Sequence, residues 1–239
     1  MDAVAQRPAG IDQTAILKDP PPELANYLTK FHGTEAGAPY RAEGWSVRIA
    51  NLSKVCALQP VVFWDHATER AATVDETNLE SSAAVTLPLP GQDSLPVQFD
   101  SHRNTWMISS RNPNLKLVGH VSSPVHDLKG GIACGFVVAV TPSFVQVALY
   151  RGRYVLRDGY HRSLGLLARG IKHVPVLFRE FSPHSDLGLG QGMLAGDAYL
   201  GDRPPLLSDY LDDTVSAEVF LPASQKMVVV QGLEMNPLG

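Results

Sequence analysis

The residues whose types are best suited to binding or catalysis lie together at 158–163, in the string DGYHRS. The guanidinium of Arg162 can bind two phosphate oxygens at once, and His161 adds a donor whose charge responds near neutral pH. Gly159 lets the backbone approach a ligand closely. A helix that begins here would present unpaired N–H groups and the positive end of its dipole. These residue types together predict a phosphate-binding turn.

Asp158, directly before this turn, has two interpretations. In a phosphate site its carboxylate could hold a magnesium ion or accept a hydroxyl proton. As a purely structural residue it would cap the helix, because Asp is a preferred N-cap and an exposed Arg and His nearby need no ligand. Arg at a helix start is unfavourable for the helix dipole, which favours a bound anion slightly. The sequence leaves both interpretations open.

The turn lies within a basic segment of an acidic chain. Residues 151–179 contain seven Lys or Arg side chains and a single acid, whereas the whole chain of 239 residues has a net charge of −4. A short basic segment favours a local anionic ligand over a long polyanion. A solvated hairpin and helix face would explain the same charges.

The elements around the turn are a hairpin, a helix and a strand. Residues 144–150 and 153–157 alternate apolar and polar residues about an Arg-Gly turn, which predicts a β-hairpin. Residues 160–169 place Leu164, Leu167 and Ala168 on one helical face, and Gly170 follows as a stop signal. Residues 172–181 then predict a closing strand.

The rest of the chain predicts further short elements. Residues 1–40 form an N-terminal extension with a Pro-led helix, 41–185 the main domain, and 186–239 a Gly/Pro-rich C-terminal extension with a pair of strands. We expect strands at 45–52, 56–64, 116–123, 215–222 and 225–235, a hairpin at 95–114 that turns at 101–104, and a helix from Asp65, which would cap it.

Composition restricts the location and partners of the chain. No signal peptide is visible, and the longest apolar run, at 132–140, is too short to span a bilayer, which predicts a cytoplasmic protein without membrane contact. The two cysteines, Cys56 and Cys134, fit a reducing compartment and are expected to be small core residues. The net negative charge argues against nucleic acid as a partner. A homodimer is left open.

Other patterns carry less chemistry. The eight histidines show no metal-ligand spacing, so no protein metal site is predicted. The string GLGQG at 188–192 lacks the preceding strand and the lysine of a phosphate loop, and a flexible loop is the better interpretation. The aromatic residues of alternating segments are expected in the core: Phe63, Trp64, Trp106 and Tyr150.

The string GRYVLRDGYHRSLGLLARGIKHVPVLF, residues 152–178, resembles the ligand loop of the ParB/sulfiredoxin superfamily. There a strand leads into a Gly-x-x-Arg turn, a helix follows, and a short Val-Pro-Val strand closes the unit. The resemblance covers about residues 136–180, and 58–64 resembles the early strand of that fold weakly. It implies an α+β, ParB/sulfiredoxin-like fold with a mixed sheet and short helices, flanked by the two extensions.

The loop distinguishes the members of this superfamily. Sulfiredoxins carry a cysteine where Tyr160 stands, so their chemistry is not expected. Partitioning ParB proteins carry Gly-Glu-Arg-Arg for CTP, of which Gly159 and Arg162 match while Tyr160 and His161 differ. They also continue into a helix-turn-helix, which the Gly/Pro-rich region after residue 182 does not resemble. The ParB-like free-serine kinases carry Asp-Gly-His-His-Arg, and this chain matches four of the five residues.

The resemblance therefore implies a nucleotide-binding protein that transfers phosphate from ATP to the hydroxyl of a small-molecule acceptor. The nucleotide would be ATP or CTP with Mg²⁺, and Asp158 would be the catalytic residue. Asp65 or Glu69 could supply a second acid. A non-catalytic nucleotide-binding regulatory module and a DNA-associated ParB-like protein remain the alternatives. The nucleotide would lie against five residues: Gly159, Tyr160, His161, Arg162 and Ser163.

Overall fold

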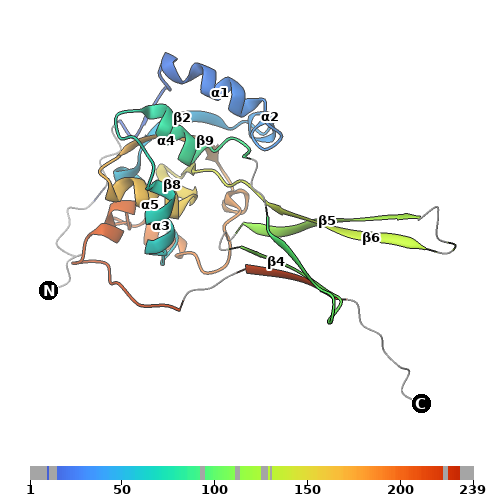
Figure 1. The fold of residues 1–239 in the computed structure, drawn as a ribbon. Coiled ribbons are helices and arrows are strands. Elements are labelled where there is room, and N and C mark those ends of the chain that lie inside the picture. The colour runs from blue at the N-terminus through green and yellow to red at the C-terminus, as the bar shows by residue number, and fades with distance from the viewer. Residues whose placement is uncertain are drawn as a thin grey trace. The chain divides into compact units, whose positions relative to one another are not determined.

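The computed structural model describes residues 10, 15–91, 95–110, 114–124, 129, 131–222 and 226–231. The chain forms two compact units, each described by itself below (Figure 1). Unit 1 contains residues 1–90 and 143–219, and unit 2 contains 91–142 and 220–239. Both are built from short elements, which confirms the mixed α+β class. The boundaries of the two units differ from those of the predicted ranges 1–40, 41–185 and 186–239.

Unit 1 is organised around a five-stranded mixed sheet in the order β1-β2-β9-β7-β8. Strands β7 and β9 are parallel, and the other neighbours are antiparallel. In this order β7 lies between β8 and β9, so the chain must pass across β7 on its way from β8 to β9, and helix α5 lies in that connection. The strands are β1 (Leu17–Lys18), β2 (Ser46–Asn51), β7 (Gln146–Tyr150), β8 (Arg153–Asp158) and β9 (His173–Phe181).

Short helices accompany this sheet and share one apolar core with it. The central strands are buried almost throughout, and α5 contributes its apolar face to the core. Helices α3 and α5 pack closely against each other, and both are visible beside β8 in Figure 1. The α-helices are α1 (Ala25–His32), α2 (Ala38–Ala42), α3 (Trp64–Ala71), α4 (Leu79–Thr86), α5 (Tyr160–Ala168) and α6 (Gly196–Leu200). Single 3-10 turns lie at η2 (Pro22–Leu24), η3 (Leu52–Lys54), η4 (His184–Leu187) and η5 (Leu207–Leu211).

The predicted hairpin, helix and closing strand are confirmed as β7–β8, α5 and β9. The hairpin turns at Arg151 and Gly152, whose φ angles of 47° and 74° fit the two-residue turn that suits twisted strands. Arg151 therefore adopts a conformation that is uncommon for a residue other than glycine. The local sequence signals and the structure agree over the whole segment that leads into α5.

Unit 2 interrupts unit 1 between α4 and β7. The backbone N–H of Val145 donates to the carbonyl of Thr86 over 2.8 Å, so the chain returns to the core close to where it left. Unit 2 has a three-stranded antiparallel sheet, β10-β4-β3, and a two-stranded ribbon, β5–β6. Its strands are β3 (Val97–Asp100), β4 (Thr105–Ser110), β5 (Leu115–Pro124), β6 (Ile132–Val140) and β10 (Lys226–Gln231). The hairpin predicted within 95–114 is confirmed as β3–β4.

Two predicted strands and one predicted helix cap are wrong. Residues 56–64 form no strand, since they make only an isolated bridge at Cys56 and α3 already begins at Trp64. Asp65 lies inside the first turn of α3 and does not cap it, because the N-cap position is Phe63. Residues 215–222 form no strand, so the predicted terminal strand pair is absent; β10 pairs with β4.

Both predicted extensions contribute to the core of unit 1. Leu24 and Phe31, from the N-terminal segment, are fully buried, and so are Leu187, Tyr199 and Leu207, from the segment expected to have little core of its own. The short helices in these segments are too small to bury an apolar face alone, and they do so against the sheet. Neither segment is merely an appendage of the sheet.

Several predicted core residues are exposed. The aromatic side chains of Phe63, Trp64 and Trp106 are about half exposed, whereas Tyr150 is buried as expected. Cys56 is buried, but Cys134 is exposed on β6. An alternating pattern identifies the apolar face of an element but not whether another element covers it. No helix within the described ranges is long and apolar enough to span a membrane.

Candidate functional site

Helix α5 begins at a glycine that no other residue could replace without strain. Gly159 is the N-cap with a φ of 94°, in the left-handed region. A Cβ at Gly159 would lie 2.8 Å from the Cα of Val145 and 2.7 Å from its side chain. Both the backbone conformation and the close approach of Val145, just before β7, therefore require glycine here.

The predicted N-cap role of Asp158 is wrong. Asp158 precedes the N-cap position, and no side chain in the described part of the chain caps α5. One oxygen of its carboxylate accepts from the N–H of Gly159 over 2.6 Å, and the residue is otherwise exposed.

The structure places Tyr160 in the core of unit 1. Its ring is buried, and its hydroxyl donates to the carbonyl of Leu156 over 2.6 Å. The same oxygen accepts from the N–H groups of Leu58 and Gln59 over 2.7 and 3.2 Å. Burial raises the pKa of Tyr160 well above its usual range. This hydroxyl joins segment 58–59 to the start of α5 and replaces the strand pairing expected for that segment.

Arg162 is also largely committed to the fold. It is 6% exposed, and its Nη1 donates to the carbonyl of Ser143. Burial and the neighbouring Arg70 lower the pKa of Arg162 to about 10. A guanidinium has five N–H donors, so the N–H groups of Arg162 other than the one that donates to Ser143 are of the right type to bind an anion.

His161 is the residue of the turn whose polar chemistry is least satisfied. Its Nε2 is buried and has no hydrogen-bond partner among the described residues. Its ring stacks on Phe63 with centroids 6.0 Å apart and meets His66 edge to face at 5.5 Å. Burial, and then the charges of His66, Arg70 and Arg162, lower the pKa of His161 to about 4. The ring is therefore neutral near pH 7 and lies in a positive environment.

Helix α3 adds a histidine and an arginine to this environment. His66 and Arg70 are four residues apart and share one face of α3. The neighbouring residue Ala67 packs so close to α5 that a Cβ at Gly165 would lie 2.0 Å from its carbonyl oxygen. This close crossing places the His66 and Arg70 face against the first turn of α5. We call the set His66, Arg70, His161 and Arg162 the cationic cluster.

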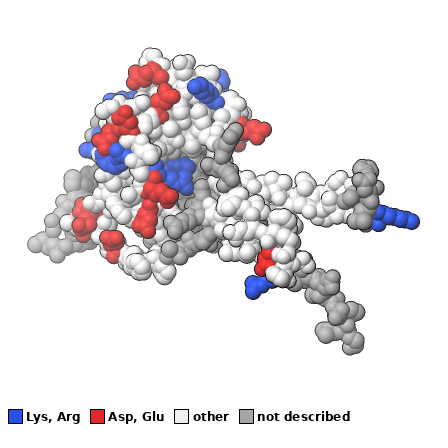
Figure 2. Space-filling model, viewed as in Figure 1, with Lys and Arg blue, Asp and Glu red and all other residues white. Residues whose placement is uncertain are grey.

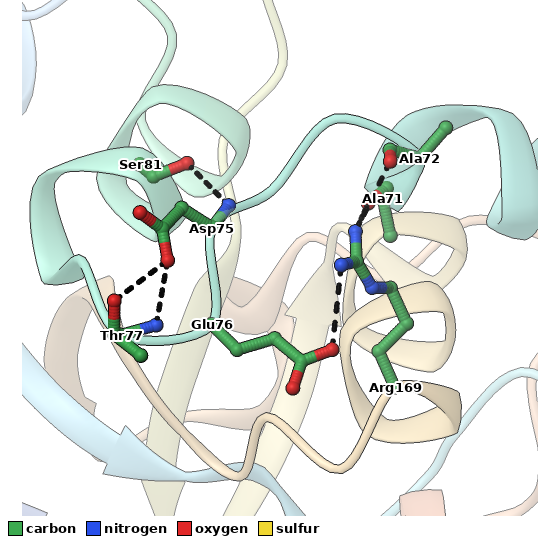
Figure 3. A network of polar contacts seen from close by, with 7 residues as sticks. All are labelled: Ala71, Ala72, Asp75, Glu76, Thr77, Ser81 and Arg169. Atoms are coloured by element: carbon green, nitrogen blue, oxygen red, sulfur yellow. Dashed lines mark hydrogen bonds and ion pairs between the residues drawn. The ribbon is translucent and has the colours of Figure 1, made fainter.

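A polar network fixes the other end of the same helix pair (Figure 3). Arg169, which follows α5, donates to the carbonyl groups of Ala71 and Ala72 at the end of α3 and forms an ion pair with Glu76 at 3.3 Å. Because a cation meets the last carbonyls of α3, the charge also suits the negative end of its dipole. The two helices are thus tied together at both ends of their contact, which positions the cationic cluster.

An apolar rim borders the cluster on α3. Phe63 and Trp64 are 46% and 48% exposed, and Val61 just before them is exposed as well. Half-exposed aromatic rings beside positive groups are suited to stack on a planar ligand that also carries negative charge. The sequence analysis assigned both aromatic residues to the core and so missed this rim.

The acids near the turn do not form a recognisable metal site. Asp158 affects the pKa of Tyr40, which is raised by burial first and by this carboxylate second. The two candidates for a second acid, Asp65 and Glu69, lie exposed on α3. Among the described residues no group of three or more His, Cys, Asp or Glu could hold a metal ion.

Of the predicted site residues, Ser163 is the most deeply buried. It is 0% exposed, and its Oγ has no hydrogen-bond partner within the described ranges. The sequence analysis missed His66 and Arg70 as members of the cluster. Their spacing of four residues on a predicted helix was a usable signal, because it places both on one face.

Comparison with known proteins gives no further assignment: no protein-family model, no curated protein and no solved structure matches this chain.

Proposed function

We propose that this chain binds a nucleotide through its phosphates at the first turn of α5. The observation that carries the proposal is the buried Nε2 of His161, which has no hydrogen-bond partner in the described part of the chain and lies inside the cationic cluster. An anion placed there would accept from this ring nitrogen and from the helix N-terminus, and it would reduce the mutual repulsion of the cations.

The aromatic rim supports a nucleotide over a simple phosphate. Phe63 and Trp64 expose ring surface at the start of α3, and Phe63 also stacks on His161. A base stacked on such a ring gains contact without any specific hydrogen bond. ATP and CTP with Mg²⁺ are the nucleotides that the superfamily resemblance implies, and the β8–turn–α5–β9 order supports that resemblance.

Phosphoryl transfer is a second candidate, favoured by the exposure of Asp158 at the edge of the turn. In that reaction the oxygen of a small-molecule hydroxyl would form a bond to the γ-phosphorus of ATP. The bond from that phosphorus to the β–γ bridging oxygen would break, and ADP would leave. The carboxylate of Asp158 would accept the hydroxyl proton.

Thermal melting with a panel of ligands tests the binding proposal. ATP, ADP, CTP, GTP and inorganic phosphate are compared with and without Mg²⁺. At least one nucleotide should raise the melting temperature more than phosphate does, because ligands that bind only the folded state stabilise it. Equal melting in all conditions would overturn the proposal.

Arg70→Gln is the informative variant for this panel. Arg162→Ala would also remove the contact with Ser143 and is expected to unfold the region, so it does not isolate binding. Arg70→Gln should abolish most of the nucleotide shift, and Lys172→Gln serves as the control. Lys172 is an exposed basic residue of the 151–179 segment outside the cluster, so its loss should leave the shift unchanged.

Asp158→Asn separates binding from transfer. Asn retains an oxygen acceptor for the N–H of Gly159, so folding and the nucleotide shift should persist. Release of ADP in the presence of a mixture of small-molecule alcohols should be lost if the carboxylate accepts the proton. Nucleotide binding without any ADP release in the wild-type protein would instead identify a non-catalytic binding module.

A further inference from the structure

The imidazole of His161 lies in a place that disfavours a second proton on the ring. Its Nε2 is buried, with no hydrogen-bond partner in the described part of the chain, and the ring of His66 lies edge to face with the centroids 5.5 Å apart. Arg70 and Arg162 are the other neighbours whose charges act on this ring. A protonated ring would lose its hydration and would also repel two guanidinium groups, and both effects favour the neutral form.

The charged groups on the other elements around α5 do not offset this positive environment. No carboxylate is among the described groups whose charges act on His161. Helix α5 also packs against α4, η3 and η5, whose charged residues are Glu80, Lys54 and Asp209. The charge of Glu80 acts on Tyr27. The charge of Asp209 acts on Tyr210. Residues 58–63, which lead into α3, carry no charged side chain.

The acids nearest to the cluster along the chain lie at the surface. Asp65 and Glu69 are exposed, and over α3 the face shown in Figure 2 carries acidic as well as basic side chains. Burial and Arg70 lower the pKa of Arg162 more than Asp158 raises it. The positive environment of His161 is therefore a local property of the buried cluster and not of a broad basic surface.

We propose that a nucleotide bound at the first turn of α5 causes His161 to take up a proton from solvent, so that the site binds its ligand more tightly as pH falls through the neutral range. This inference rests on the proposed nucleotide binding. A phosphate oxygen beside Nε2 would accept a hydrogen bond from this nitrogen, and its negative charge would favour the imidazolium form. The same charge would offset Arg70 and Arg162, whose repulsion keeps the free ring neutral.

The direction of the effect follows from the linkage between protons and ligand. The free ring, with a pKa of about 4, is neutral from about pH 8 to about pH 6, whereas a ring beside an anion gains a proton as pH falls. Binding therefore takes up protons in this range, and the affinity rises as pH falls. If the anion only restores the pKa of His161 to its ordinary value of 6.5, the affinity should rise about fourfold between these two pH values.

Calorimetry of ATP and CTP binding, each with Mg²⁺, at about pH 8 and about pH 6 tests the proposal. The phosphates of the ligand titrate near pH 6 themselves, but this contribution is common to all variants of the protein and cancels when variants are compared. Relative to His161→Asn, the wild-type affinity should gain about fourfold on going to the lower pH. His173→Asn is the matched control, because His173 is an exposed histidine outside the cluster. That variant should show the same gain as the wild-type protein.

Two further measurements locate the proton and do not depend on whether His161→Asn folds. Nitrogen-15 NMR of the histidine-labelled wild-type protein at about pH 6 should show a neutral ring at His161 without nucleotide and a protonated ring with it. His66→Asn should keep the gain in affinity at low pH, because the proton goes to His161. Loss of the gain in His66→Asn with a neutral His161 in the complex would assign the proton to His66 and would overturn the proposal.

The outcomes separate this inference from the proposed function. Nucleotide binding whose affinity ratio between the wild-type protein and His161→Asn is the same at both pH values overturns the proton uptake and leaves the nucleotide site standing. A ring of His161 that stays neutral in the complex does the same. Absence of nucleotide binding at both pH values overturns the inference and the proposed function together.

Discussion

Removing the hydroxyl of Tyr160 tests whether this residue supports the fold or contacts the ligand. The superfamily resemblance gave Tyr160 a place in the nucleotide site, whereas the structure buries its ring. Its hydroxyl makes three hydrogen bonds to backbone groups, at Leu156, Leu58 and Gln59. Tyr160→Phe removes all three and leaves the ring in place. We therefore expect a loss of stability with little direct effect on a ligand.

The size of the stability loss in Tyr160→Phe follows from the backbone groups that lose their hydrogen-bond partner. A buried polar group left without a hydrogen bond costs about 1–3 kcal/mol. The N–H of Leu58 lies in a fully buried residue, while Gln59 is only partly buried and can turn to water. We expect the free energy of unfolding to fall by about 2–3 kcal/mol. At roughly 2–4 °C per kcal/mol for a chain of this size, the melting temperature should fall by about 5–10 °C.

Urea unfolding followed by circular dichroism measures this loss. Tyr27→Phe is the matched control, because Tyr27 is equally buried and its hydroxyl donates to the carbonyl of Leu87 over 2.9 Å but does not join two segments by two backbone N–H groups as Tyr160 does. That variant should lose only about 1 kcal/mol. If Tyr160→Phe were as stable as the wild-type protein but no longer bound nucleotide, the structural role argued here would be refuted.

Two further predictions concern the start of α5. Gly159→Ala should destabilise the protein by more than about 2 kcal/mol, because an L-residue at a φ of 94° is strained and the new Cβ would collide with Val145. Thermal melting measures this loss. Gly170→Ala is the control, since Gly170 has a φ of 79° but open space around its Cα, so the difference between the two variants is due to the collision. His161 should contribute a loss of stability as pH falls from about 6.5 to 4, since the unfolded ring gains a proton in this window and the folded ring, with a pKa of about 4, does not. The slope of unfolding free energy against pH in this window should therefore be smaller in His161→Asn.

Each of these has a clear opposing result. Equal melting of the two alanine variants would show that Val145 moves aside for the new methyl group. An unchanged pH slope in His161→Asn would show that His161 is solvated well enough to titrate normally, and it would weaken the phosphate proposal as well.

The segment around α5 was predictable from sequence because its signals are local. The Arg-Gly turn, the alternation of 146–157 and the helical spacing after Gly159 all act within a few residues of one another. The parallel pairing of β7 with β9 and the division into two discontinuous units depend on contacts between distant residues. No local pattern encodes them.

The failures have physical causes as well. Residues 58–64 have the apolar, β-branched composition of a strand, but the N–H of Leu58 is satisfied by the Tyr160 hydroxyl and not by a neighbouring strand. Cys134, within the apolar run 132–140, was expected in the core but is exposed, because composition indicates a need for cover and does not show whether the chain itself supplies it. In the site, His66 and Arg70 become significant only through the close crossing of α3 and Gly165.

The hydrogen bond between Thr86 and Val145 has a consequence for how this chain can vary. The core closes on itself at this point, so the residues from 87 to 144 form one large loop between two anchored ends. The entropy of closing a loop grows only with the logarithm of its length, and doubling that length costs about 0.6 kcal/mol. Homologous chains can therefore carry inserts of very different size at this junction, or a short linker, around a nearly unchanged core of unit 1.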